Sequence, residues 1–368
     1  PPKSPPLPPE KIAIIREWIS TGLRETSASK SLSSGTKILF TPGVNAAMKP
    51  NGPPPMPATL AEIKTPATKR RLPVVAMAAN PWSPLLAVSG HERIRLLNIE
   101  TRKEIGRLAF PEGIPNVLRF SRNGGLLLAA GGKPVQAGSV VLFDVRSGKR
   151  VAEIGDELDA VQAADISPDQ RLVVLGGSSR IVKAYATADS SPKYTLTKHT
   201  DWITSIAFSP DGKQLATGDR AGGIHLWDAS SGGILLSLTS HKGSVRALAW
   251  RSDSKVLASA GDDGQLTWWN SEDGFASISH ASPHNPARPA GVFGKLPNGV
   301  LAACFANDGT LLTCGRDNHA RFWSTGGGQQ RTFPIEQATP TQVAISHDGK
   351  TFIVGDAGGD VHFFAAAQ

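Results

Sequence analysis

The chain has 368 residues, of which 40% are hydrophobic, 38 are glycine and 28 are proline, a mixture that favours an all-β protein with a sizeable core and many tight turns. Residues 1–73 hold 11 basic and four acidic side chains, whereas the rest of the chain holds 28 and 27, so a nucleic-acid-binding body is not expected. No apolar run approaches the ~18 residues of a membrane span, and Cys304 and Cys314 are too few and wrongly spaced for a disulfide scaffold or a zinc site.

The first element expected along the chain is a short amphipathic helix over residues 10–23, EKIAIIREWISTGL. Ile12, Ile15 and Ile19 share one face at helical spacing, and Gly22 can cap the end of the helix. Because an isolated helix of this length is marginal in water, its apolar face is expected to pack on another part of the protein.

This tail, residues 1–23, resembles the end of the small c-type cytochrome domains that precede WD repeats in planctomycete-type bacteria. The matching positions are Pro6, Leu7, Glu10, Ile12, Ile15, Trp18, Ile19 and Gly22. The resemblance implies a native protein that is longer at its N-terminus and lies in the periplasm or another extracytoplasmic place. The haem-attaching Cys-x-x-Cys-His is absent from this sequence, so no cofactor is expected in this chain, and haem only in an upstream segment. The alternative is an arbitrary amphipathic helix on a cytoplasmic protein.

The tail is followed by residues 24–72, which are rich first in serine and then in proline and are expected to form a linker. From residue 73 to residue 368 one unit recurs: an apolar strand, a polar turn, a second strand that ends in glycine, and a third strand that ends in an aromatic residue. The clearest copy is Ile203–Asp228, with strands ITSIAF, QLATG and IHLWD around the turn SPDG.

Seven residues occupy the position that ends the third strand, and five of the six intervals between them are 41 to 46 residues long: Leu97, Phe143, Tyr185, Trp227, Trp269, Trp323 and Phe364. A period of about 40 to 45 residues with four short strands per unit is the signature of a β-propeller. The sequence therefore predicts an all-β, seven-bladed propeller of four-stranded blades.

This repeat resembles the WD-repeat family, although only Trp227-Asp228 is the literal dipeptide. In that family a His before the first strand, a Ser or Thr in the second, an Asp in the next turn and the third-strand Trp form a hydrogen-bonded tetrad. The resemblance implies a full tetrad in the fifth repeat and incomplete ones in the fourth, where Ala221 holds the Asp position, and in the sixth, which lacks the His. The residues are His241, Ser259, Asp263 and Trp269; His199, Thr217 and Trp227; and Thr313, Asp317 and Trp323.

A hydrolase would use the residue types of His241, Ser259 and Asp263, so a catalytic triad is the alternative interpretation. The tetrad is favoured because these positions recur in register with a Trp, whose indole N–H needs a buried acceptor. No catalytic residue, metal site or cofactor site is therefore expected.

Two further structural features are predicted outside the regular repeat: a strand that closes the ring and a long loop. Because the chain stops after the third strand of the seventh unit, the closing strand is expected from Thr36–Phe40 or from the stretch Leu60–Thr65, which is slightly favoured. Between Ala276 and Gly299 about 12 extra residues predict a long solvated loop. His280 and His284 would suit a metal if that loop were helical, but the neighbouring prolines argue against a helix.

Together these features favour a non-enzymatic scaffold that binds another protein through its loops. Four residues in turns between repeated strands are the candidate contacts, since an aromatic residue beside cations is typical of an interface: Trp202, Arg220, Lys242 and Arg316. The alternative is an accessory docking module of an extracytoplasmic c-type cytochrome redox protein.

Overall fold

A computed structural model describes residues 8, 11, 48–50, 52–57, 60, 72–285, 298–336 and 338–365. The chain divides into two compact units, Pro1–Lys37 and Ile38–Gln368, and only Pro8 and Lys11 of the first are described. The helix expected over 10–23 and the candidate strand Thr36–Phe40 lie outside the described residues. The account below concerns the second unit.

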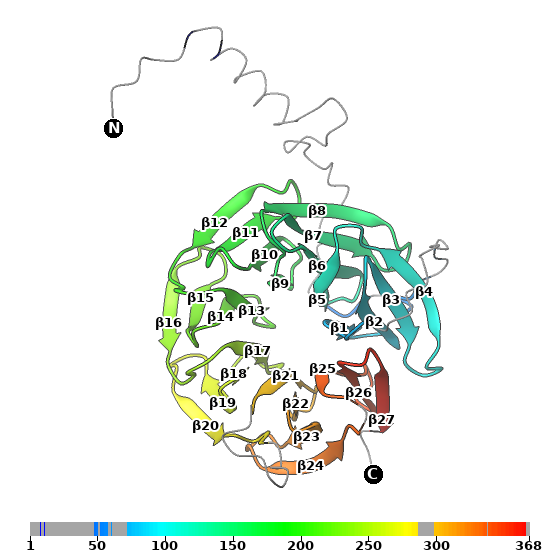
Figure 1. The fold of residues 1–368 in the computed structure, drawn as a ribbon, viewed down its shortest axis with the longest axis vertical. Helices are drawn as coiled ribbons and strands as arrows, with labels where there is room; N and C mark the ends of the chain where they lie inside the picture. The colour runs from blue at the N-terminus through cyan, green and yellow to red at the C-terminus, as the bar shows by residue number, and fades with distance from the viewer. Residues whose placement is uncertain are drawn as a thin grey trace. The chain divides into compact units, whose positions relative to one another are not determined.

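In this second unit the described residues form seven antiparallel sheets around a central channel, which confirms the prediction of an all-β, seven-bladed propeller (Figure 1). The strands are, in blade one, β1 Met77–Ala79, β2 Leu85–Gly90, β3 Arg93–Asn98 and β4 Glu104–Ala109; in blade two, β5 Ile114–Phe120, β6 Leu126–Lys133, β7 Ala137–Asp144 and β8 Arg150–Glu157; in blade three, β9 Ala163–Ile166, β10 Leu172–Gly176, β11 Val182–Ala186 and β12 Pro192–Leu196; in blade four, β13 Ile203–Phe208, β14 Gln214–Asp219, β15 Ile224–Asp228 and β16 Ile234–Leu238; in blade five, β17 Val245–Trp250, β18 Val256–Gly261, β19 Gln265–Asn270 and β20 Ala276–Ala281; in blade six, β21 Val300–Phe305, β22 Leu311–Gly315, β23 His319–Trp323 and β24 Gln329–Pro334; and in blade seven, β25 Pro340–Ile345, β26 Thr351–Asp356 and β27 Val361–Ala365.

Each blade packs both of its faces against neighbouring blades, which explains why apolar residues occur on both sides of its strands. In the cluster between blades four and five, Ile224 and Leu226 of β15 pack with Val245 of β17 and Leu257 of β18. Every one of these four side chains is fully buried. Since burying one such side chain stabilises a fold by roughly 1.5–3 kcal/mol, the contacts between blades hold the ring together.

The ring is closed by contacts between blade seven and blade one. The innermost strand β25 lies against β1, as every innermost strand lies against the next around the channel (Figure 1). The amide of Val74 donates to the carbonyl of Asp356 at 3.0 Å, and the Thr341 hydroxyl donates to the carbonyl of Val74 at 2.6 Å. Val74, three residues before β1, is therefore hydrogen-bonded to both β25 and β26.

The predicted turns between first and second strands have the expected backbone conformation. Gly212 has a φ of +74°, in the left-handed region that the Ser-Pro-Asp-Gly turn requires. In blade three Gln170 occupies the same turn position and has a φ of +61°. The repeat therefore keeps its turn geometry where the glycine is replaced.

Among the described residues, the sheet of blade seven contains three strands, β25, β26 and β27. A fourth strand for this blade is not among them. Of the favoured candidate Leu60–Thr65 only Leu60 is described, and it packs with Met56 against the cluster between blades one and two. Which segment closes blade seven thus stays a prediction.

The long loop expected between Ala276 and Gly299 begins later than predicted. Ala276–Ala281 forms β20, the outer strand of blade five, because it continues the pairing from β19: Leu266 lies opposite His280. The prediction of a solvated loop was wrong for these residues, and residues 286–297 lie outside the described part of the chain.

Candidate functional site

The order of strands separates the loops onto two ends of the ring. Loops that precede a first strand, and loops that join second to third strands, lie at one end; the other turns lie at the opposite end. We call the first end the channel-mouth face, and it includes Val135, Trp202, Arg220, Lys242 and Arg316. The tetrads begin on this face, because their histidines precede first strands.

The structure brings all four tetrad residues of blade five together. The Trp269 indole N–H donates to Ser259 Oγ at 2.8 Å, and Ser259 Oγ lies 2.8 Å from His241 Nε2. His241 Nδ1 lies 3.0 Å from Asp263 Oδ1, which fixes its proton on Nδ1. The serine hydroxyl must then donate to Nε2 and cannot also act as a free nucleophile.

Burial supports the same conclusion for blade five. Ser259 is 0% exposed, as is the His241 side chain, so a substrate cannot reach either group. Burial acts to raise the pKa of Asp263, but hydrogen bonds from His241 and from the backbone amides of Lys242 and Gln265 outweigh it, and the pKa lies below its ordinary value. The carboxylate is therefore charged and structural.

Replacing His241 or Asp263 with alanine is expected to lower the free energy of unfolding by about 1 to 3 kcal/mol, because each change leaves buried polar partners unsatisfied. Urea unfolding followed by circular dichroism measures this. Lys242→Ala is the matched control, since only the backbone amide of Lys242 contacts Asp263. Wild-type stability in both tetrad variants would refute the structural role.

Blade four contains a complete tetrad, contrary to the prediction that Ala221 leaves it without an Asp. His199 lies 2.7 Å from Thr217 Oγ1 through Nε2, and Trp227 donates to the same oxygen at 2.8 Å. The carboxylate comes from Asp219, whose Oδ2 lies 2.8 Å from His199 Nδ1. Asp219 is the last residue of β14 and is paired with Ile203 as Gly261 is paired with Val245 in blade five. A carboxylate at this position of blade four therefore also reaches the imidazole.

Blade six also has its histidine, so the prediction that it lacks one was wrong. His284 lies 2.8 Å from Thr313 Oγ1 through Nε2 and 2.8 Å from Asp317 Oδ1 through Nδ1, and Trp323 donates to Thr313 Oγ1 at 2.8 Å. His284 is 0% exposed. The residue expected in a solvated loop is therefore part of the core, and both of its ring nitrogens are engaged within the tetrad.

Its neighbour in the sequence, His280, lies on β20 and has a different environment. Its Nε2 lies 2.8 Å from the carbonyl of Gly327, and its ring lies 5.0 Å from that of Trp323. Among the residues that the structure describes, no group of three or more His, Cys, Asp or Glu side chains could hold a metal ion. The same residues include no helix long and apolar enough to cross a membrane.

The half-buried His225 and the buried His284 make stability depend on pH. Burial, together with the nearby His199 and Lys198, lowers the pKa of His225 from 6.5 to about 4, and burial lowers the pKa of His284 despite the neighbouring Asp317. The unfolded chain binds protons at these sites near pH 6.5, whereas the folded chain does not until the pH nears 4 at His225. The unfolded state therefore holds more protons in this window.

We accordingly expect the free energy of unfolding to fall as the pH is lowered from about 6.5 towards 4, and urea unfolding at several pH values measures it. The variant His225→Gln removes one of the two groups and should make the slope shallower. A stability that is constant, or that rises, over this window would contradict the assignment.

A cavity of about 920 Å³ opens at the channel mouth. Alternate residues of the seven innermost segments line it at two levels. The outer level contains a single charged side chain, Arg246, and its members are Val75, Asn116, Gln162, Thr204, Arg246, Leu301 and Thr341. The inner level is entirely apolar and consists of Met77, Leu118, Ala164, Ile206, Leu248, Ala303 and Val343. The cavity thus combines an apolar floor with a wall that is largely polar.

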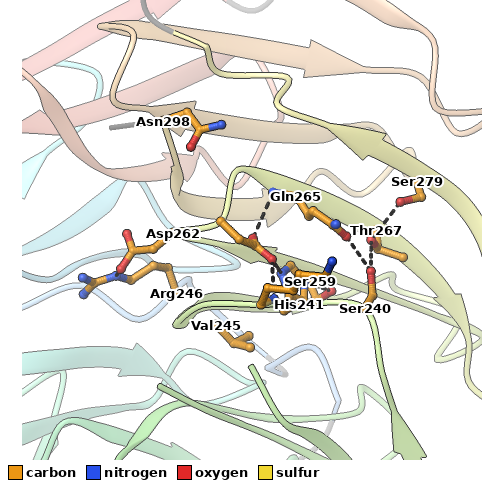
Figure 2. Close-up of polar contacts among 12 residues, drawn as sticks. Ser240, His241, Val245, Arg246, Ser259, Asp262, Gln265, Thr267, Ser279 and Asn298 are labelled. Carbon is orange, nitrogen blue, oxygen red and sulfur yellow. Dashed lines mark hydrogen bonds and ion pairs between the residues drawn. The ribbon is translucent and has the colours of Figure 1, made fainter. Parts of the chain in front are cut away.

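Two of the arginines that line the cavity share one carboxylate. Arg246 Nε lies 2.7 Å from Asp262 Oδ2, and Arg316 Nη2 lies 3.0 Å from Asp262 Oδ1 (Figure 2 shows the first pair). The Arg246 and Arg316 side chains remain 45% and 36% exposed. This group therefore carries one net positive charge that faces solvent.

The four contact residues predicted from the sequence all lie on the channel-mouth face. Trp202 is 40% exposed and lines the cavity, as does Arg316. The guanidinium of Arg220 lies over the Trp202 ring, 5.1 Å from its centroid. Lys242 follows the tetrad histidine, and its side chain makes no ion pair with any residue that the structure describes.

Three residues of this face were missed from the sequence: Arg246, Val135 and Leu158. Val135, between β6 and β7, is 85% exposed and has a φ of +58°, and Leu158, which follows β8, is 86% exposed. The sequence did indicate that blade two is longer in the region of Val135. The interval from Leu97 to Phe143 is 46 residues, four more than the 42 residues between the next residues that end a third strand. Blade two has the extra length in its β6–β7 hairpin, whose strands have eight residues each.

Comparison with known proteins agrees with the fold. A family model described as WD domain, G-beta repeat matches residues 190–228, 232–270 and 290–324. These segments cover the three blades whose tetrads are complete. A search of the curated proteins found no match. Propellers of this kind commonly mediate interactions between proteins and are typically not catalytic.

Proposed function

We propose that this propeller of WD40 repeats is a non-enzymatic scaffold that binds another protein through its channel-mouth face. The observation that carries the proposal is Val135. Its backbone lies in the left-handed region, which β-branched residues rarely adopt, and its side chain is 85% exposed. A conformation that costs about 1–3 kcal/mol and buries almost nothing in the free protein is typical of a functional surface.

Other features of the same face support this proposal. Leu158 and Trp202 add exposed apolar surface, and Arg220 stacks on the Trp202 ring. Large aromatic residues beside arginine are the side chains that most often dominate binding energy at protein interfaces. The rigid ring holds these loops in fixed positions, so little conformational entropy is lost on binding.

The absence of enzymatic activity is part of the proposal. The His, Ser or Thr, and Asp of the three tetrads are buried and paired with one another, which leaves them no role in catalysis. Cys304 and Cys314 are poor nucleophiles, because burial raises the pKa of the Cys304 thiol to about 12 and that of Cys314 still further.

Affinity purification of the full chain from extracts of its native host, with quantitative mass spectrometry, tests the proposed function. The double variant Val135→Ser, Trp202→Ala should lose a protein that the wild type retains. Phe275→Ala is the matched control, because Phe275 is 75% exposed in the β19–β20 turn at the opposite end of the ring. If the double variant retains every partner of the wild type, the channel-mouth face is not the binding surface.

A further inference from the structure

We infer that the partner presents an extended peptide segment in which an aspartate or glutamate stands beside an apolar residue. The inference rests on the proposed function and specifies the chemistry of its partner. The acidic group is assigned to Arg246 and Arg316, and the apolar residue to the surface formed by Trp202 and Val135. All four residues line the same cavity, so one short segment can reach both sites.

Charge complementarity carries the first half of the inference. Arg246 and Arg316 share Asp262, which leaves one positive charge uncompensated, and Arg246 is the only charged side chain among the seven of the outer level. Arg220 and Lys242 add two further cations, neither of which forms an ion pair within the described part of the chain. A carboxylate is the anionic group that a guanidinium binds with two parallel hydrogen bonds.

The carboxylates on the same face do not cancel this charge. Asp159 accepts hydrogen bonds from the backbone amides of Val135 and Ala160, at 2.9 and 2.8 Å, and Asp201 accepts one from the amide of Trp202 at 2.7 Å. These interactions hold the acidic groups against their own loops. Of the charged side chains that line the cavity, three are arginines (Arg119, Arg246 and Arg316) and one is acidic (Asp159), so an incoming segment meets an excess of positive charge.

The apolar half of the inference depends on the surface next to these arginines. Trp202 presents a ring whose one side carries Arg220, while the cavity floor beneath consists of side chains such as Ile206 and Leu248. Val135 stands at the rim of the cavity. An apolar residue of the partner that covers this surface would remove exposed apolar area from water, which favours binding.

A nucleic acid fits these observations less well than a peptide. Aliphatic side chains such as Val135 and Leu158 offer no flat surface on which a base can stack. Outside residues 1–73 the chain has 28 basic and 27 acidic side chains, which gives no extended cationic surface.

Selection from a displayed library of random short peptides on the full-length protein tests this inference. The enriched peptides should carry Asp or Glu within two positions of Leu, Phe or Trp. A fluorescent copy of the most enriched peptide should bind at least roughly tenfold more tightly than its Asn/Gln counterpart, because a charged hydrogen-bonding group is lost. It should also bind more tightly than a labelled single-stranded DNA.

Variants identify the arginines. Arg246→Gln and, separately, Arg316→Gln should each weaken binding of the acidic peptide by roughly tenfold and leave binding of the Asn/Gln peptide unchanged. Arg171→Gln is the matched control, since that side chain is 76% exposed in the β9–β10 turn at the opposite end. Thermal unfolding of each variant establishes that it is folded.

Enrichment of basic or uncharged peptides, no enrichment, equal affinity for the acidic and amide peptides, or tighter binding of the DNA would each overturn the inference. These results are separate from a failure of the proposed function. If the native partner still requires Val135 and Trp202 while the peptides show no preference for acidic residues, only the assigned chemistry is wrong.

Discussion

Replacing His284 with alanine is expected to lower the free energy of unfolding by about 2 to 4 kcal/mol, the largest stability effect that we predict in blade six. The change leaves the Thr313 hydroxyl and the Asp317 carboxylate without the imidazole that bridges them, and it opens a cavity at a fully buried position. Arg321 remains beside Asp317 at 2.5 Å, so part of the carboxylate's stabilisation is retained.

His280→Ala is the matched control for this prediction, because His280 lies near the end of β20, only four positions before His284. His280 is only partly buried and has one hydrogen bond, so we expect a loss of about 1 kcal/mol. Urea unfolding of both variants measures the difference. Equal losses in the two variants would show that His284 is not a tetrad residue.

Asp219→Ala is expected to destabilise blade four by about 2 to 4 kcal/mol. Asp219 is 1% exposed and accepts hydrogen bonds from His199 Nδ1 and from the amide of Gly223, both at 2.8 Å. Its removal leaves two buried donors without an acceptor. The substitution Ala221→Asp should change stability by less than about 0.5 kcal/mol, because Ala221 is exposed and the imidazole already has its acceptor.

A double variant sharpens this second prediction. Asp219→Gly combined with Ala221→Asp gives blade four the arrangement of blade five, where Gly261 and Asp263 hold the equivalent positions. It should recover part of the stability that Asp219→Ala loses. Thermal unfolding followed by tryptophan fluorescence measures the stability of each variant. A double variant no more stable than Asp219→Ala would show that the tetrads of the two blades do not share one geometry.

The seven blades could be predicted because the residue that ends each third strand, in most blades an aromatic one, recurs at nearly constant intervals. The turns between the first and second strands also keep their polar residues. The tetrad of blade five was equally accessible, since His241, Ser259, Asp263 and Trp269 all stand at the usual spacing. His284 was not accessible, because the connection before blade six is longer: it precedes Thr313 by 29 residues, whereas His241 precedes Ser259 by 18. A variable loop hides such a residue from any argument based on spacing.

Asp219 was missed for a different reason. An alignment of the repeats expects the carboxylate of blade four at the position of Ala221, which is equivalent to Asp263 of blade five. Asp219 stands two residues earlier, and its carboxylate nevertheless reaches the imidazole of His199. Arg246 and Val135 were missed because their significance depends on what surrounds them. The seven residues of the outer level come from segments far apart in the sequence, and only the closed ring shows that Arg246 alone among them is charged.

Site-specific photo-crosslinking in the native host tests most directly the claim that the channel-mouth face binds a protein. A benzophenone amino acid is placed at Val135 in one full-length variant and at Phe275, at the opposite end of the ring, in another. Both positions are largely exposed, so the probe should not disturb the fold. We predict a defined cross-linked protein from position 135 and none, or only diffuse background, from position 275. Cross-links of equal yield to the same protein from both positions, or from position 275 alone, would contradict the account.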